Sequence, residues 1–101
     1  MRELSYTGRI FDANQALDYG FATELADNPL AKALEVAAVI ANKNPDAIRS
    51  NKRLYNVSHK LSAAEGLLME SVEQDKIMGT ANQLEAVLAQ IEGRMPNFTR
   101  R

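Results

Sequence analysis

Signals for the start of a helix recur along the whole chain. Ser, Thr, Asp or Asn at an N-cap accepts hydrogen bonds from free backbone N–H groups, and proline suits the first helical position. Such signals occur at Asp12 with Gln15, Asn28 with Pro29, Asn44 with Pro45, Ser62 with Glu65, and Thr80 with Gln83. Gly20, Gly79 and Gly93 stand where helices should end. A chain of 101 residues with so many helix starts leaves little room for a sheet, so we predict an all-α fold of about five to six short helices.

Two segments fall outside this helical pattern. Residues 21–25 form the only stretch with an extended character, and they are too short for more than a single strand or a bend. The last segment, from Gly93 on, has no helical spacing, and we expect the glycine to let it swing away from the preceding helix as an unstructured end. We therefore predict a single helical domain over residues 1–101 with one short extended segment.

The predicted helices carry apolar stripes at helical spacing. One stripe lies on residues 30–41 and another on residues 84–91. The segment from Ser62 to Met78 has a wider apolar surface than one neighbouring helix would cover. Large exposed apolar surfaces mark contacts with partners, and most homo-oligomers are symmetric. We therefore expect the chain to associate with copies of itself.

Composition excludes several classes of protein. The formal net charge is −1, so no overall field attracts nucleic acid or an anionic membrane. No apolar run is long enough to span a membrane, and the N-terminus lacks the apolar stretch of a secretory signal. The chain has no cysteine, which excludes thiolate chemistry and is compatible with a reducing compartment. We expect no nucleic-acid partner, no membrane association and a cytoplasmic location.

The residues offer no complete catalytic group. General acid–base catalysis needs positioned groups of suitable pKa that face one substrate. The acids Glu65, Glu70, Glu73 and Asp75 are most simply explained as a solvated helix face. His59 is the only histidine, so a transition-metal site of usual composition cannot form around it. We predict no catalytic residue and no metal ligand in this chain.

An ordered series of short motifs runs through the chain. It comprises Thr7-Gly8-Arg9, Asp12-Ala13, Ala16-Leu17, Gly20-Phe21-Ala22, Asn44-Pro45, Lys52-Arg53-Leu54, Ser62 with Glu65 and Glu70, Glu85-Ala86-Val87, and Arg94-Met95-Pro96-Asn97-Phe98. Each motif is weak alone. Taken in order and with their spacing, they resemble the enoyl-CoA hydratase/isomerase (crotonase) family over essentially the whole chain.

The resemblance implies that this chain is one part of a larger enzyme. In the family the matching region is the C-terminal helical part, which forms trimers or hexamers and follows a spiral domain of repeated β-β-α units. The spiral domain supplies the oxyanion hole and the acid–base residues, and it is absent here, so the resemblance implies that this chain alone is inactive. The parent reaction would be hydration or isomerisation of an enoyl-CoA through a stabilised thioester enolate, with no tightly bound cofactor. A free-standing helical interaction module without any connection to acyl-CoA is the alternative.

The tail resembles the closing sequence of the family, whose lysines and final phenylalanine approach the adenine and phosphates of coenzyme A. The matching residues are Glu92, Arg94, Pro96 and Phe98, whereas Gln90, Gly93 and Met95 depart from the pattern. The resemblance therefore implies that Arg94 and Phe98 contact coenzyme A. Phe98 could instead pack against the edge of the core.

A basic stripe recurs at helical spacing after Pro45. It consists of Arg49, Lys52, Arg53, Asn56 and Lys60, and Lys43 precedes it. The stripe could be a solvated helix face, a contact for the phosphates of coenzyme A or, remotely, a contact for nucleic acid. Lys52 is the residue of the stripe that we expect to contact coenzyme A.

Overall fold

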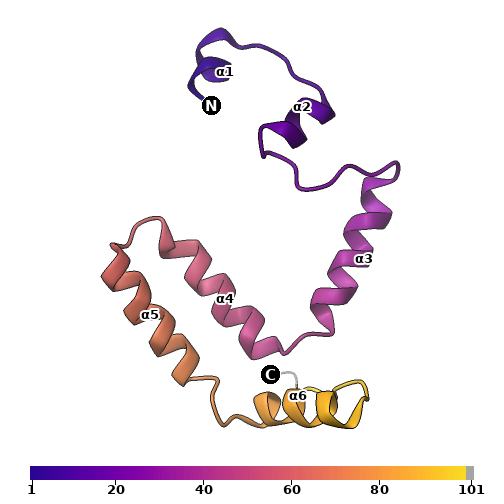
Figure 1. Ribbon diagram of the computed structural model, residues 1–101, viewed down its shortest axis with the longest axis vertical. Coiled ribbons are helices and arrows are strands. Elements are labelled where there is room, and N and C mark those ends of the chain that lie inside the picture. Colours follow the sequence, from indigo (N-terminus) through magenta and orange to yellow (C-terminus); the bar gives the residue numbers. More distant parts are fainter. Residues whose placement is uncertain (100–101) are drawn as a thin grey trace. The chain divides into compact units, whose positions relative to one another are not determined.

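The structure is a computed structural model that describes residues 1–99 and is all-α over that range (Figure 1). Its elements are α1 (Arg2–Thr7), α2 (Ala13–Asp18), α3 (Pro29–Ala41), α4 (Pro45–Ser58), α5 (Ala63–Asp75) and α6 (Ala81–Glu92). The described range contains no strand, and residues 21–25 form an irregular segment with bends at Phe21 and Thr23. The prediction of an all-α fold with about six short helices is confirmed. None of the helices in this range has the length and apolar character needed to cross a membrane.

The predicted caps start the helices. Side-chain oxygens of Asp12, Asn28 and Asn44 accept hydrogen bonds from backbone N–H groups, with N···O distances of 2.9, 3.1 and 2.9 Å. Asp12 and Ser62 each complete a capping box, in which the side chain three residues on returns a hydrogen bond to the backbone of the cap. These bonds satisfy N–H groups that have no partner inside the helix, so the helix starts follow from local sequence.

Helix α1 is not predicted by this cap pattern. Its N-cap, Met1, makes no side-chain capping bond, so the sequence lacks the usual signal. The end of α1 is marked by Gly8, which has a φ of 62° and donates its N–H to the carbonyl of Leu4. Glycine reaches this left-handed conformation without steric cost.

The helix expected over residues 62–78 is shorter in the structure, because α5 ends at Asp75 and a turn follows.

The chain divides into two compact units, and the boundary falls within α3 after Val36. In the first unit, three aromatic rings pack together beyond α1. Phe11 lies edge-on to Tyr19 and stacks on Phe21, with ring centroids 5.9 and 5.3 Å apart. Arg9 donates a hydrogen bond of 3.0 Å to the hydroxyl of Tyr19. This local cluster holds the segments on both sides of α2 together.

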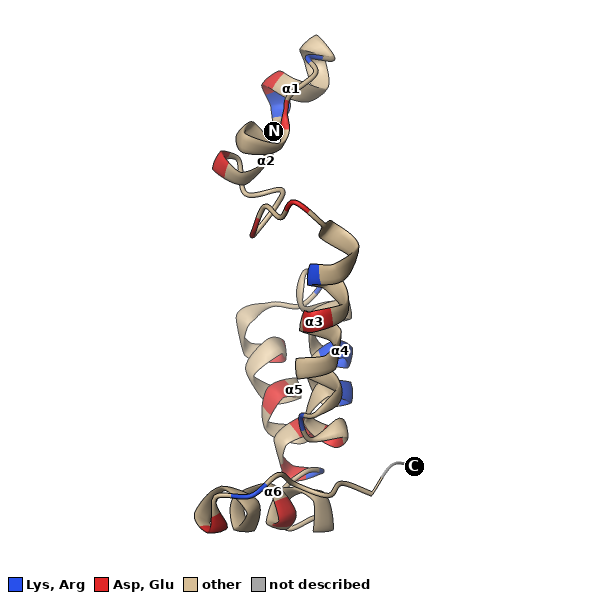
Figure 2. Ribbon diagram, turned by 90° about the vertical axis from the view of Figure 1, so that its right-hand side faces the viewer, with Lys and Arg blue, Asp and Glu red and all other residues tan. Residues whose placement is uncertain are grey.

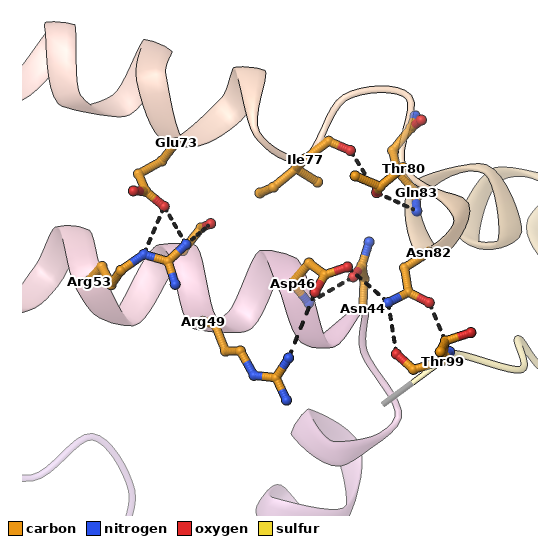
Figure 3. Close-up of polar contacts among 11 residues, drawn as sticks. Asn44, Asp46, Arg49, Arg53, Glu73, Ile77, Thr80, Asn82, Gln83 and Thr99 are labelled. Carbon is orange, nitrogen blue, oxygen red and sulfur yellow. Dashed lines mark hydrogen bonds and ion pairs between the residues drawn. The ribbon is translucent and has the colours of Figure 1, made fainter. Parts of the chain in front are cut away.

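The second unit, from Ala37 on, is organised around α4 and α5, which lie side by side and run in opposite directions (Figures 1 and 2). α6 crosses the end of this pair at which α4 begins (Figure 1). An ionic cluster of Ser50, Arg53, Glu73 and Lys76 joins α4 to the C-terminal part of α5. Arg53 Nε donates to Glu73 Oε2 at 2.9 Å (Figure 3). Lys76 Nζ donates to Glu73 Oε1 at 2.7 Å.

Glu73 is the buried member of this cluster. Its side chain is only 5% exposed, and Arg53 also bonds the buried hydroxyl of Ser50 at 2.8 Å. The hydrogen bonds from Arg53, then those from Lys76 and Ser50, lower the pKa of Glu73 to about 2. A buried carboxylate is tolerated only when it is paired in this way, so the cluster fixes how α4 and α5 meet.

Apolar burial within the described chain is very small. Ala89 is its only buried hydrophobic residue. The stripe predicted on residues 84–91 is confirmed as one face of α6, but Leu84, Val87, Leu88 and Ile91 are all exposed on it. On α5, Leu67 and Leu68 are 66% and 67% exposed. Burial of apolar surface is the main favourable contribution to folding, and most of it is not realised among the described residues.

We expect Glu73→Gln to lower the midpoint of thermal unfolding at pH 7, measured by circular dichroism. Folding lowers the pKa of Glu73 from its ordinary value of 4.5 to about 2, because Arg53, Lys76 and Ser50 bond its carboxylate. A lowered pKa means that its carboxylate stabilises the fold above the unfolded value, and that this contribution is lost as the pH falls from about 4.5 to 2. The difference between the variant and the parent chain should therefore shrink over that interval.

Glu70→Gln is the matched control, because Glu70 lies on the same helix, is exposed and makes no ion pair within residues 1–99. It should leave the midpoint at pH 7 close to that of the parent chain. Equal midpoints for Glu73→Gln and Glu70→Gln at pH 7 would contradict the role assigned to the ionic cluster.

Candidate functional site

An apolar hollow of the second unit is a groove with a volume of about 490 Å³. Its apolar wall consists of Val39 at the end of α3, Ala86 and Ala89 on α6, and Met95, Pro96 and Phe98 in the tail. Its polar rim consists of Asn42, Lys43, Asn44, Gln90 and Arg94. The groove therefore combines an apolar wall with a rim that carries amides and two cations, and none of these lining residues is acidic.

The tail reaches the groove because Gly93 reverses the chain. Gly93 adopts a left-handed conformation with a φ of 66°, and the N–H of Arg94 donates to the carbonyl of Ala89 at 3.0 Å. This geometry is a common C-cap that turns the chain back along the helix it ends. The expectation of an unstructured tail that swings away is wrong for residues 94–99. They have no regular secondary structure, but side chains of α6 hold them in place.

Glu85 is the first of two α6 residues that hold the tail. Arg94 makes a two-pronged contact with its carboxylate, in which Nη2 lies 3.0 Å from Oε2, and Asn97 donates its backbone N–H to Oε1 at 2.7 Å. The bonds from Arg94 and then from Asn97 lower the pKa of Glu85 to about 2. Arg94 also bonds Glu92, and the two carboxylates, Glu85 first, raise the pKa of its guanidinium. The charge of Arg94 is thus matched by nearby acids.

Asn82 is the second residue, one helical turn before Glu85. Its Nδ2 donates to the carbonyl of Thr99 at 3.0 Å, and its Oδ1 accepts the N–H of Thr99 at 2.9 Å (Figure 3). The same Nδ2 donates to Asp46 Oδ2 on α4 at 2.8 Å. Asn82 is 6% exposed and its polar atoms are all bonded, so one buried amide joins α4, α6 and the tail.

The structure brings together two of the three residues expected at a coenzyme A site. Arg94 and Phe98 line the same groove, whereas Lys52 does not belong to it. Lys52 is exposed on α4, where Figure 2 shows basic residues in blue. Lys43, which the sequence placed only as the residue preceding the basic stripe, also lines this groove. That position could not be predicted, because its approach to the tail depends on how the segments of the second unit pack.

The remaining basic residues of α4 take part in ion pairs. Arg53 pairs with Glu73, and Arg49 Nη1 lies 3.7 Å from Asp46 Oδ1 (Figure 3). Both arginines line a second hollow of about 260 Å³, together with the ends of α5 and α6. Because their charges are balanced by acids of the same chain, this hollow serves the packing of the helices, and the groove beside the tail is the stronger candidate for a site.

Comparison with known proteins agrees with the resemblance drawn from the motifs. No protein-family model matches the chain. A probable enoyl-CoA hydratase of Mycobacterium leprae is 38% identical over 98% of the chain, which corresponds to 39% of that protein. A carnitinyl-CoA dehydratase of Proteus mirabilis is 33% identical over 97% of the chain and 40% of its own length.

A solved structure matches the fold over nearly the whole chain. The crystal structure of an enoyl-CoA hydratase from Bacillus anthracis matches 96% of the chain with a TM-score of 0.90 and 32% sequence identity. The match covers 38% of that protein. The resemblance to the enoyl-CoA hydratase/isomerase family is confirmed in sequence and in fold, and the chain spans about two fifths of the length of the relatives that it matches.

We expect Asn82→Ala to release the end of the tail. The substitution removes both bonds to Thr99 and leaves the carboxylate of Asp46 without its amide partner, at a cost of about 1–3 kcal/mol for the unpaired groups. Hydrogen exchange measured by NMR should show the amide of Thr99 becoming much faster, while amides in the middle of α5 change little. Asn56→Ala, at an exposed site on α4, is the control. A Thr99 amide that stays as protected as in the parent chain would show that Asn82 does not hold the tail.

Proposed function

We propose that residues 1–101 form the C-terminal helical part of an enoyl-CoA hydratase or isomerase. The observation that supports the proposal most directly is similarity along nearly the whole chain, in sequence and in fold, to proteins named enoyl-CoA hydratase. The parent reaction would be addition of water to an enoyl-CoA, or isomerisation of its double bond, through a stabilised thioester enolate. A relative named carnitinyl-CoA dehydratase fits the same class of chemistry.

In this proposal the chain supplies an oligomer contact and a cover for the active site, and the catalytic groups lie elsewhere. The described acids are engaged in structure: Glu65 caps α5, Glu73 joins two helices, and Glu85 holds the tail. The exposed apolar faces of α5 and α6 offer surface for the rest of the enzyme and for sister copies. A trimer or a hexamer is the proposed assembly, in the cytoplasm.

Coenzyme A is the proposed ligand of the groove beside the tail. Phe98 and Arg94 form part of its wall and rim, and an aromatic ring and a guanidinium suit the adenine and phosphates of the nucleotide. Lys52 would approach the same substrate from the exposed face of α4. The substrate binds as a thioester and leaves as product, so no tightly bound cofactor is proposed.

The activity is tested by comparing the isolated 101-residue chain with the complete natural polypeptide that contains it. Loss of the conjugated thioester of crotonyl-CoA is followed by ultraviolet absorbance. We expect turnover by the complete polypeptide and none by the isolated chain, because the chain brings no acid–base pair to one site. Turnover by the isolated chain, or failure of the complete polypeptide to turn over or bind any enoyl-CoA, would overturn the proposal.

Self-association is tested on the outer face of α5. Leu68 and Val72 lie one turn apart and are exposed, so the double variant Leu68→Glu with Val72→Glu places two charges in the proposed contact. Burying unpaired carboxylates is costly, and we expect sedimentation velocity to show the oligomer converted to smaller species. Gln74→Glu adds a negative charge to an exposed site of the same helix and should leave the oligomer intact. An unchanged sedimentation profile for the double variant would exclude this face from the contact.

A further inference from the structure

The two cations at the rim of the groove are in different electrostatic states. The guanidinium of Arg94 is bonded to Glu85 and to Glu92. The ammonium of Lys43, by contrast, is exposed and makes no hydrogen bond or ion pair with any residue in the range 1–99. Since the lining residues include no acid, Lys43 is the lining cation whose charge no neighbouring carboxylate matches within residues 1–99.

The surroundings of Lys43 suit a phosphate group attached to a flat ring. A lysine ammonium binds phosphate as a compact point charge, and it does so best when no carboxylate competes for it. The amides of Asn42 and Gln90 line the same groove, and Phe98 and Pro96 contribute apolar lining to it. The groove therefore offers a charge, hydrogen-bonding groups and a stacking surface together.

We infer that Lys43 supplies the uncompensated positive charge that binds a phosphate of the nucleotide end of acyl-CoA, and that Arg94 contributes mainly by keeping the tail in place. The inference rests on the proposed acyl-CoA function and adds a residue to it. Arg94 bonds Glu85, whose carboxylate also accepts a hydrogen bond from the N–H of Asn97. These contacts hold the tail segment that carries Phe98, so Arg94 and Lys43 have different roles.

The test uses Lys43→Gln in the complete natural polypeptide, with adenosine 3′,5′-bisphosphate and adenosine as probes in isothermal titration calorimetry at low salt. Removing one exposed charge contact should weaken binding of the bisphosphate by about fivefold and leave binding of adenosine unchanged. The difference should diminish as salt is raised, because the interaction is screened. Arg2→Gln removes one positive charge from an exposed site outside the groove and outside the basic stripe, and it should bind both probes as the parent does.

The outcomes separate this inference from the proposed function. If Lys43→Gln and Arg2→Gln bind the bisphosphate equally well, the inference is overturned, while turnover of crotonyl-CoA by the parent leaves the function standing. If the parent turns over crotonyl-CoA but does not bind the bisphosphate, the groove is not the nucleotide site and the inference is again overturned. If the parent shows neither activity nor binding, both fail. A selective loss of bisphosphate affinity in Lys43→Gln supports the inference.

Discussion

The apolar faces of α5 and α6 are exposed to solvent in this chain, and this exposure constrains every other feature of the structure. Helices of this length are marginal in water on their own and gain most of their stability by packing an amphipathic face against other structure. Here α5 and α6 present such faces, yet Ala89 is the only buried hydrophobic residue in residues 1–99. We propose that other protein covers these faces, in agreement with relatives that are about two and a half times as long as the region they share with this chain.

Polar contacts fix the relative positions of the helices and the tail, a role that a hydrophobic core usually has. Glu73 joins α4 to α5, Asn82 joins α4 to α6, and Glu85 holds the tail against α6. Each is a carboxylate or amide that is bonded on several sides, and such groups fix orientation because only one arrangement satisfies all their partners. The groove beside the tail is a product of these contacts, because Asn82 and Glu85 hold the segment that carries Phe98.

The sequence predicted what local chemistry decides. Asp12, Asn44, Ser62 and the other caps start helices where expected, since a cap and its partners lie within a few residues. α1 was not predicted, because Met1 gives no capping signal. The path of the tail was predicted wrongly, because it is set by Asn82 and Glu85 and not by Gly93 alone. Lys43 and Phe98 share a groove although they are distant in sequence, and no spacing rule could place them together.

We propose that the exposed faces of this chain are contact surfaces for other protein. The fluorescence of an apolar dye bound to the isolated chain tests this, at a dilution where sedimentation shows a monomer. We expect strong dye fluorescence at that dilution, and a decrease as concentration rises and copies cover one another's faces. A monomer that binds no dye and unfolds in one cooperative transition would contradict it, because such a chain would bury its apolar side chains without help.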